Sequence, residues 1–170
     1  MGDMNAKETH SIHVTHNWIV AVMAFTPFIV GCTALPLLPP ANLTEPGWTI
    51  YQGQALWRTK NDAPEIAGEF LVGLRENGQT FAQFTKNPLP MIIAQASTNH
   101  WQVEMPMQNK RYAGKGKPPK RLIWLYLPSV LAGQPPPAGW SWQQQSGDAW
   151  RLENTASGER LEIYRELTEF

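Results

Sequence analysis

The chain has 170 residues, a formal net charge of zero and 16% charged residues, so it is neither a strongly basic nucleic-acid binder nor a disordered chain. Its single cysteine, Cys32, excludes an intrachain disulfide and a zinc site built from several thiolates. Eight tryptophans and six phenylalanines suffice for a sizeable core or an apolar cavity, and fifteen prolines with thirteen glycines favour short strands over long helices.

The amino-terminal region resembles the signal peptide of a bacterial lipoprotein. Residues 18–30 (WIVAVMAFTPFIV) carry no charge, which matches a signal-peptide apolar region and falls short of the roughly 20 residues of a transmembrane helix. Ile29 stands three positions before Cys32, and the small residue Gly31 directly before it. This resemblance to the lipobox implies cleavage between Gly31 and Cys32 and a diacylglyceryl group on the Cys32 thiol. The alternative is a signal anchor or a core helix with an incidental cysteine.

The expected signal peptide covers residues 1–31, and a lipidated cysteine with a proline-rich tether covers residues 32–47. Before the apolar run, only Lys7 carries a fixed positive charge, so either the signal is weak or the chain starts at Met4. Two or three acyl chains, at about 0.8 kcal/mol per buried CH₂, would hold the protein stably on a membrane. The lipoprotein resemblance implies a periplasm-facing position in the cell envelope, and threonine at position 33 favours the outer membrane.

Alternation of apolar and polar residues predicts about eight short strands in a β domain over residues 48–170. Their expected ranges are 48–58, 65–75, 79–86, 90–97, 99–105, 139–145, 149–154 and 159–167. The pair Asn77-Gly78 predicts a hairpin between the second and third of them. Short connections predict antiparallel neighbours.

Residues 120–133 (KRLIWLYLPSVLAG) are almost wholly apolar and predict a helical segment between strands. A short helix is expected over 121–127 and a further turn over 128–132, ended by Gly133. An apolar helix in a β chain must lie against the sheet. The predicted fold is therefore mainly β, a curved antiparallel sheet or incomplete barrel with this segment as a lid.

The predicted β domain contains no recognisable catalytic or metal-binding pattern. The chain lacks G-x-S-x-G and H-E-x-x-H, His100 is the only histidine beyond the leader, and the glutamates are scattered among the strands. We therefore expect a protein that is not an enzyme and that needs no cofactor or metal.

Residues 109–121 (NKRYAGKGKPPKR) are predicted to form a basic loop. Its basic residues, six of the fourteen in the chain, are Lys110, Arg111, Lys115, Lys117, Lys120 and Arg121. Pro118 stands where a phosphate loop needs Ser or Thr. The loop is either simply solvated or contacts anionic lipid headgroups or an acidic partner, at about 1 kcal/mol per basic residue near an anionic surface. Nucleic acid is not an expected partner, because a secretory leader would carry the chain away from it.

Large apolar side chains recur through the predicted strands and the helical segment. They either fill an ordinary core or line a cavity for acyl chains. The candidate cavity residues are Trp57, Phe70, Phe81, Phe84, Trp101, Val103, Trp124, Leu125 and Trp150.

The order of these features resembles the LolA/LolB-like family of lipoprotein carriers and receptors. The resemblance rests on Tyr51-Gln52-Gly53 in an early strand, the Asn77-Gly78 hairpin, the step Asn87-Pro88-Leu89-Pro90, the helix end Leu131-Ala132-Gly133, and Gly158-Glu159-Arg160-Leu161 opening the last strand. It implies a strongly curved, incomplete barrel with an apolar cavity under short helices. With the lipobox, it implies a membrane-anchored lipoprotein that binds acyl chains or lipoproteins and aids outer-membrane lipoprotein localisation. The alternative is an accessory lipoprotein with a filled β domain that docks on an envelope complex.

Overall fold

A computed structural model describes residues 37–166. The predicted signal peptide, the Gly31–Cys32 cleavage site and the lipidation site Cys32 lie outside the described residues. The strands are β1 (Trp48–Arg58), β2 (Ile66–Arg75), β3 (Thr80–Lys86), β4 (Leu89–Ala96), β5 (His100–Met105), β6 (Lys110–Lys115), β7 (Trp140–Ser146), β8 (Ala149–Asn154) and β9 (Arg160–Arg165). The helical segments are the 3₁₀ helices η1 (Pro106–Gln108) and η2 (Ile123–Leu125) and the α-helix α1 (Leu127–Leu131).

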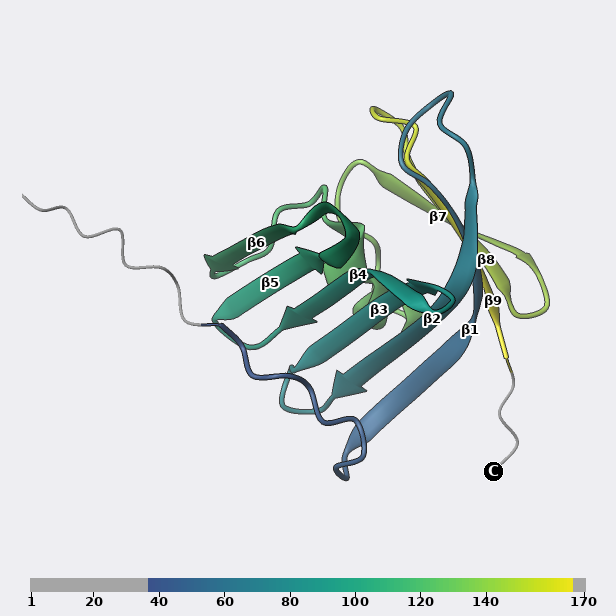
Figure 1. Cartoon of the computed structure of the whole chain (residues 1–170). Helices are drawn as coiled ribbons and strands as arrows, with labels where there is room; N and C mark the ends of the chain where they lie inside the picture. The colour runs from purple at the N-terminus through teal and green to yellow at the C-terminus, as the bar shows by residue number, and fades with distance from the viewer. Residues whose placement is uncertain (1–36, 167–170) are drawn as a thin grey trace, which may run out of the picture. The chain divides into compact units, whose positions relative to one another are not determined.

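The nine strands form one antiparallel sheet in the order β6-β5-β4-β3-β2-β1-β9-β8-β7. The sheet is strongly curved and does not close, and β7, β8 and β9 form an arm turned away from the plane of β2 to β6 (Figure 1). This confirms the expected mainly β, curved antiparallel architecture with a small helical segment. Among the described residues, none of the helices has the length and hydropathy of a membrane span.

The first and last strands are neighbours in the middle of the sheet. β1 pairs with β2 from Trp48 to Trp57 and with β9 only from Gly53 to Arg58. This register places Trp57 opposite Leu161. The end of β1 and the start of β9, far apart in sequence, therefore lie side by side.

The predicted Asn77-Gly78 hairpin is confirmed between β2 and β3. The Gly78 N–H donates to the Arg75 carbonyl at 3.0 Å, and the Asn77 side chain accepts from the Gln79 N–H at 3.0 Å. Gly78 has a φ of +82°, a conformation that costs glycine little. The local turn chemistry is therefore sufficient to set this register.

Strand β6 is not among the eight predicted strands, and it corrects the prediction of a basic loop over residues 109–121. Lys110, Arg111 and Lys115 belong to this edge strand, whereas Lys117, Lys120 and Arg121 lie in the connection that follows. β6 pairs with β5 in a register that brings Arg111 to Glu104, with an N–O distance of 3.1 Å. Its charged residues and glycine do not give the apolar alternation that predicts a strand. Edge strands often carry charged residues, which prevent pairing with other chains.

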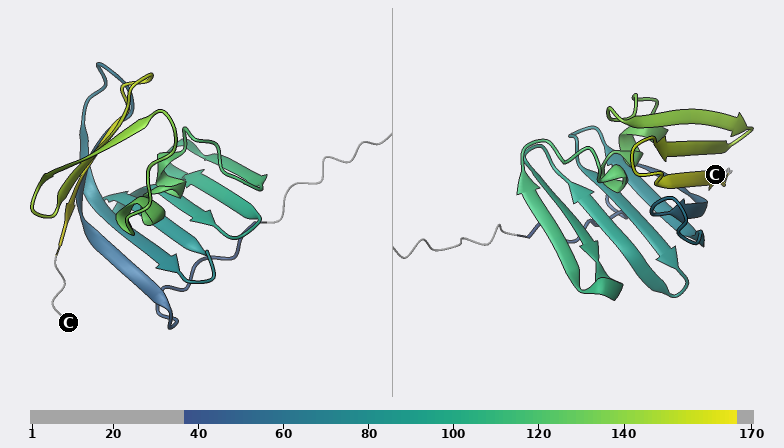
Figure 2. Two further views of the ribbon diagram at one scale, coloured as in Figure 1. Left: turned by 180° about the vertical axis from the view of Figure 1, so that it is seen from behind. Right: turned by 90° about the horizontal axis from the view of Figure 1, so that it is seen from above.

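The inner face of the sheet is the face covered by η2 and α1, which lie in the hollow of the curve (Figure 2). Strand residues of the resulting core include Ala55, Trp57, Phe70, Val72, Ala82, Phe84, Ile92, Ala94, Val103, Leu152, Leu161 and Ile163. Ile123, Trp124, Leu125, Leu127 and Val130 cover them. The expectation that the apolar segment lies against the sheet is confirmed.

The helical segment is shorter than predicted, because the helix expected over 121–127 is only the 3₁₀ turn η2. Two side chains hold the preceding backbone away from a helix. Trp140 Nε1 donates to the Lys120 carbonyl at 2.9 Å, and the Tyr126 hydroxyl donates to the Pro118 carbonyl at 2.5 Å. The second turn agrees better with its prediction, since α1 has Pro128 in its first turn and is followed by Gly133 at a φ of +89°.

Residues 37–47, which we call the strap, are fixed to the outer face of the sheet, the face opposite η2 and α1. The buried Gln102 side chain accepts from the Leu38 N–H at 2.9 Å and donates to the Leu38 carbonyl at 3.4 Å, as a neighbouring strand would. In the middle of the strap, the Asn42 carbonyl accepts from Trp48 Nε1 at 3.0 Å. This part of the predicted tether is therefore not a free linker, because polar and apolar groups of the outer face bind it.

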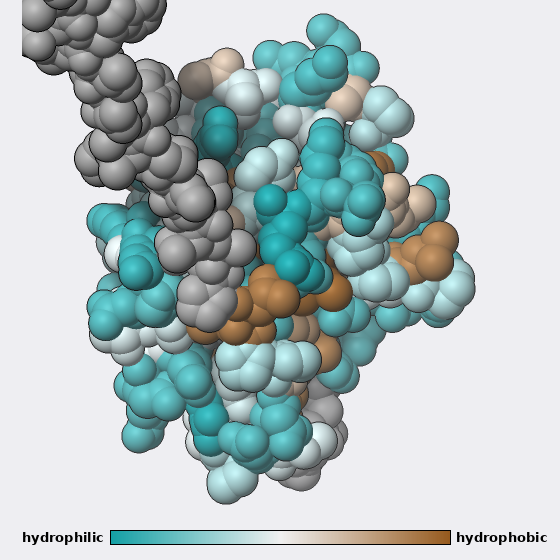
Figure 3. Space-filling model, turned by 60° about the vertical axis from the view of Figure 1, so that its left-hand side comes forward, coloured by the Kyte–Doolittle hydropathy of each residue, from teal (hydrophilic) through white to brown (hydrophobic). Residues whose placement is uncertain are grey.

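Apolar surface gathers beside the start of the described chain (Figure 3). Leu37 is 54% exposed there, and a hollow of about 590 Å³ lies between the strap and the sheet, bounded also by Phe81, Ile93 and Gln102. The sheet, its core and the helical segment all belong to the unit Ala34–Phe170, which therefore carries what it needs to fold on its own.

Candidate functional site

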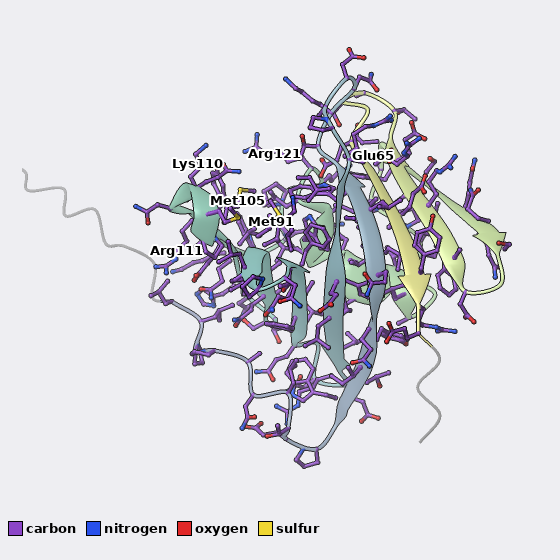
Figure 4. The ribbon with its side chains drawn as sticks, turned by 45° about the vertical axis from the view of Figure 1, so that its right-hand side comes forward. Glu65, Met91, Met105, Lys110, Arg111 and Arg121 are labelled. Carbon is purple, nitrogen blue, oxygen red and sulfur yellow. The ribbon has the colours of Figure 1, made fainter. Side chains whose placement is uncertain are left out.

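An open groove of about 650 Å³ lies at one end of the inner face. Its walls are the β5–β6 hairpin, the chain leading into η2, the end of β1 and the turn between β8 and β9. The lining residues are Trp57, Thr59, Val103, Met105, Gln108, Tyr112, Arg121, Leu122, Ile123, Trp124, Asn154, Ala156, Ser157 and Glu159. Figure 4 labels Met105 and Arg121 from this set, and also Lys110 and Arg111 at the start of β6.

The floor of the groove is a rigid aromatic cluster. Trp124 from η2 stacks on Phe84 of β3 with ring centroids 5.3 Å apart, and Trp57 meets the Trp124 ring edge-on at 5.6 Å. All three side chains belong to the buried core. Stacked and edge-to-face ring pairs at these distances are favourable arrangements of aromatic side chains. The apolar floor is therefore part of the packed core.

Glu159 supplies the one carboxylate among the described residues that line the groove. It directly precedes β9, on the same parity as the inward-facing Leu161 and Ile163. Its Oε1 accepts a hydrogen bond from Trp57 Nε1 at 3.0 Å. An acidic side chain is thus held among apolar walls, where an unpaired charge is costly.

The turn before Glu159 is built to fix its position. Asn154 Oδ1 accepts from the N–H groups of Ala156 and Ser157, each at 3.0 Å. Gly158 follows with a φ of +67°, and a Cβ at that position would overlap the side-chain amide of Asn61. The local chain therefore directs the Glu159 side chain to Trp57.

The environment of Glu159 alters its acidity. Burial raises the pKa of its carboxyl to about 7, and the hydrogen bond from Trp57 lowers it in part. This carboxyl therefore gains and loses its proton near neutral pH. A perturbed carboxyl in a concave, largely apolar site is a common property of functional sites.

Arg121 and Tyr112 are the other ionisable side chains along the groove. Both are exposed, and Tyr112 is 40% accessible. Arg121 comes directly after Lys120, whose carbonyl is bound by Trp140, so its backbone is held at the rim. The groove thus combines an apolar floor, an inner carboxyl and a basic rim.

Three of the nine predicted cavity residues line this groove: Trp57, Val103 and Trp124. Three others, Phe70, Phe84 and Leu125, belong to the buried core and do not line this groove. The curve of the sheet is largely filled by η2 and α1, so the space left for a ligand is confined to one end. The prediction of a cavity along the aromatic residues was therefore too broad.

The remaining three predicted cavity residues lie elsewhere. Phe81 is on the outer face under the strap, because it is three residues from Phe84 and strand side chains alternate. Trp101 is paired with Gly114 of β6, which leaves room for its indole ring. Trp150 stacks on Trp142 with centroids 6.0 Å apart and carries the Arg165 guanidinium on its ring, away from the groove.

The prediction missed Met105, Leu122 and Glu159 as groove residues. A sequence signal existed for Glu159, because it shares the parity of Leu161 and Ile163 and so faces inward as a charged residue. Among residues 37–166, no cluster of three or more His, Cys, Asp or Glu side chains is arranged to hold a metal ion.

The structure is thus an open, curved antiparallel β-sheet with a largely apolar groove at one end. Searches of known protein families and of curated proteins find no match to this chain.

Proposed function

We propose that this protein is a membrane-anchored lipoprotein whose β domain binds apolar chains in the groove. The observation that carries the proposal is the groove itself, about 650 Å³ in volume with a floor formed by Trp57 and Trp124. Its volume is within the range of small-molecule sites, roughly 300–1,000 Å³. The protein would sequester acyl chains or lipoproteins without covalent chemistry, and so aid their localisation at the outer membrane.

The sequence around Cys32 supports the anchor and the position in the cell envelope. Only residues 33–36 separate Cys32 from Leu37, where the strap begins. Five residue steps reach at most about 18 Å, so an acyl anchor on Cys32 would keep the domain close to the membrane. The basic residues Lys110 and Arg111 belong to the edge strand β6, which pairs with β5. In the anchored protein they would contact anionic headgroups.

Labelling with a fatty-acid analogue tests the anchor. Expressed as the full chain in a Gram-negative host, the wild type should incorporate the label and Cys32→Ala should not. Equal labelling of the two proteins would disprove lipidation at this residue.

Binding of the neutral fluorophore N-phenylnaphthylamine by the unit Ala34–Phe170 tests the groove. We expect Met105→Trp to weaken binding, because the larger ring would fill part of the groove, and Tyr164→Trp to leave it unchanged, because Tyr164 is exposed on the outer face. Undiminished binding by Met105→Trp would count against the groove as the site.

A second candidate function, an accessory lipoprotein without a ligand, is favoured by one observation. The inner face is largely filled by its own side chains, with Phe84, Ile123 and Leu127 fully buried. Absence of fluorophore binding by the wild type, together with labelling of Cys32, would favour this function.

A further inference from the structure

The proposed apolar-chain site contains a carboxylate, which the binding of apolar chains does not require. Of the described residues that line the groove, Glu159 alone carries a carboxylate, and that carboxylate is hydrogen-bonded to Trp57. A neutral or apolar residue there would avoid the cost of desolvating an acid. The presence of the Glu159 carboxylate in the groove therefore suggests that it contacts the ligand.

The hydrogen bonds of Glu159 leave one of its oxygens available. Oε1 accepts from Trp57 Nε1, and no donor within residues 37–166 reaches Oε2. Arg121, on the same groove, forms no ion pair with Glu159 in the described part of the chain. Trp57 thus orients the carboxyl and leaves an acceptor free for a bound molecule.

We infer that Glu159 selects the polar end of the ligand, an inference that rests on the proposed function. The groove takes an apolar chain that ends in a hydrogen-bond donor, such as a hydroxyl or an amide N–H. The donor binds Oε2 of Glu159, the chain lies over the aromatic floor, and Trp57 is the positioning residue for the accepting carboxylate. Molecules that end in an acceptor alone, or in an anion, are disfavoured.

This selectivity depends on pH. Since burial raises the pKa of Glu159 to about 7, the carboxyl is a neutral acid at pH 5.5 and an anion at pH 8.5. The neutral acid can donate to an ether or ester oxygen, whereas the anion can only accept. The other ionisable residues that line the groove are Tyr112 of β6 and Arg121 of the chain before η2. The residues that β1 and β5 contribute to the lining are not ionisable. Preference for a donor end therefore rises with pH.

Displacement of N-phenylnaphthylamine by three ligands of equal chain length tests the inference: 1-decanol, decyl methyl ether and decanoate. At pH 8.5 the unit Ala34–Phe170 should bind 1-decanol about tenfold or more tightly than the ether, as expected for a hydrogen bond to a charged group. At pH 5.5 the two should bind nearly equally. Decanoate should be the weakest ligand at pH 8.5.

Glu159→Gln should bind alcohol and ether nearly equally at both pH values, because the amide can donate to either oxygen. Glu153→Gln is the matched control, since Glu153 lies on β8 outside the groove and should keep the wild-type preference. If Glu159→Gln does not fold, the wild-type pH series decides by itself.

Equal binding of alcohol and ether by the wild type at pH 8.5, or an unchanged preference in Glu159→Gln, overturns the inference but leaves apolar-chain binding intact. Tightest binding of decanoate at pH 8.5 also overturns it, because Arg121 would then set the ligand class. Failure of every chain to displace the fluorophore would instead refute the proposed function, and the inference with it.

Discussion

Replacing Glu159 with glutamine should change how the stability of the β domain depends on pH. In the folded protein, burial raises the pKa of Glu159 from 4.5 to about 7, although Trp57 donates a hydrogen bond that lowers it in part. Between pH 4.5 and 7, the folded state therefore keeps a proton that the unfolded chain has lost. The free energy of unfolding must fall as pH rises through this window.

The magnitude follows from the size of the shift. A change of about 2.5 pKa units, at about 1.4 kcal/mol per unit, corresponds to about 3 kcal/mol. Wild-type stability should lose up to this amount between pH 4.5 and 8. Glu159→Gln has no proton to lose at this position, so its stability relative to the wild type should rise by up to about 3 kcal/mol over the same range.

Urea denaturation of the unit Ala34–Phe170, followed by tryptophan fluorescence at pH 4.5, 5.5, 6.5 and 8, measures this difference. Glu153→Gln is measured in parallel, and the gain of Glu159→Gln is taken relative to it, so that effects of removing any strand carboxylate cancel. If the stabilities of Glu159→Gln and Glu153→Gln change in parallel across this range, the carboxyl of Glu159 is not desolvated as described and the reasoning is refuted.

Three further substitutions test the fold that holds the site. Gln102→Leu should lower the free energy of unfolding by about 1–2 kcal/mol and speed hydrogen exchange of the Leu38 N–H. The same substitution at Gln95, which also lies on the outer face under the strap, should not speed this exchange. Equal exchange rates of the Leu38 N–H in the two variants would contradict the fixed strap. Phe84→Ala should cost about 3–5 kcal/mol in urea denaturation, because the side chain is fully buried beneath the groove, and a cost below 1 kcal/mol would contradict that packing. Gly158→Ala should cost at least about 1–2 kcal/mol, because its φ of +67° strains alanine and the added Cβ would overlap the Asn61 side chain; an unchanged denaturation midpoint would show that the turn relaxes.

The sequence was sufficient to predict most of the sheet, since alternation and turn residues are local signals. β1 and β8 have their predicted ranges, and the hairpin at Asn77-Gly78 forms as its turn chemistry requires. β6 escaped prediction because its stability comes from pairing with β5 along the chain and from the room that Gly114 leaves for Trp101, neither of which is a local property.

The site was predicted less well, for two physical reasons. Aromatic content does not separate core from cavity, so Phe84 and Trp124 were grouped although only Trp124 lines the groove. Strand parity separates Phe81 from Phe84 and places Glu159 on the same face as Leu161, but it does not show which inward-facing residues border open space. Contact between Glu159 and Trp57 depends on pairing of the first and last strands, which no short stretch of sequence contains.

The position of the strap is also not predictable from local sequence, because it depends on a distant polar side chain. A proline-rich stretch without periodicity is typical of a linker, and nothing near Leu38 in sequence indicates otherwise. Its partner is Gln102, 64 residues away, whose amide imitates a β-ladder neighbour on the outer face. Docking of the strap would shorten the reach of the proposed lipid anchor and so keep the domain closer to a membrane.

Photo-crosslinking tests the central claim, binding of apolar chains in the groove, most directly. A decyl alcohol with a diazirine at the far end of its chain is irradiated with the unit Ala34–Phe170, and the labelled peptides are identified by mass spectrometry. We predict labels on Val103, Met105, Leu122 and Trp124, which line the groove. Labels confined to the outer-face hollow under the strap, around Leu37 and Ile93, would contradict the account.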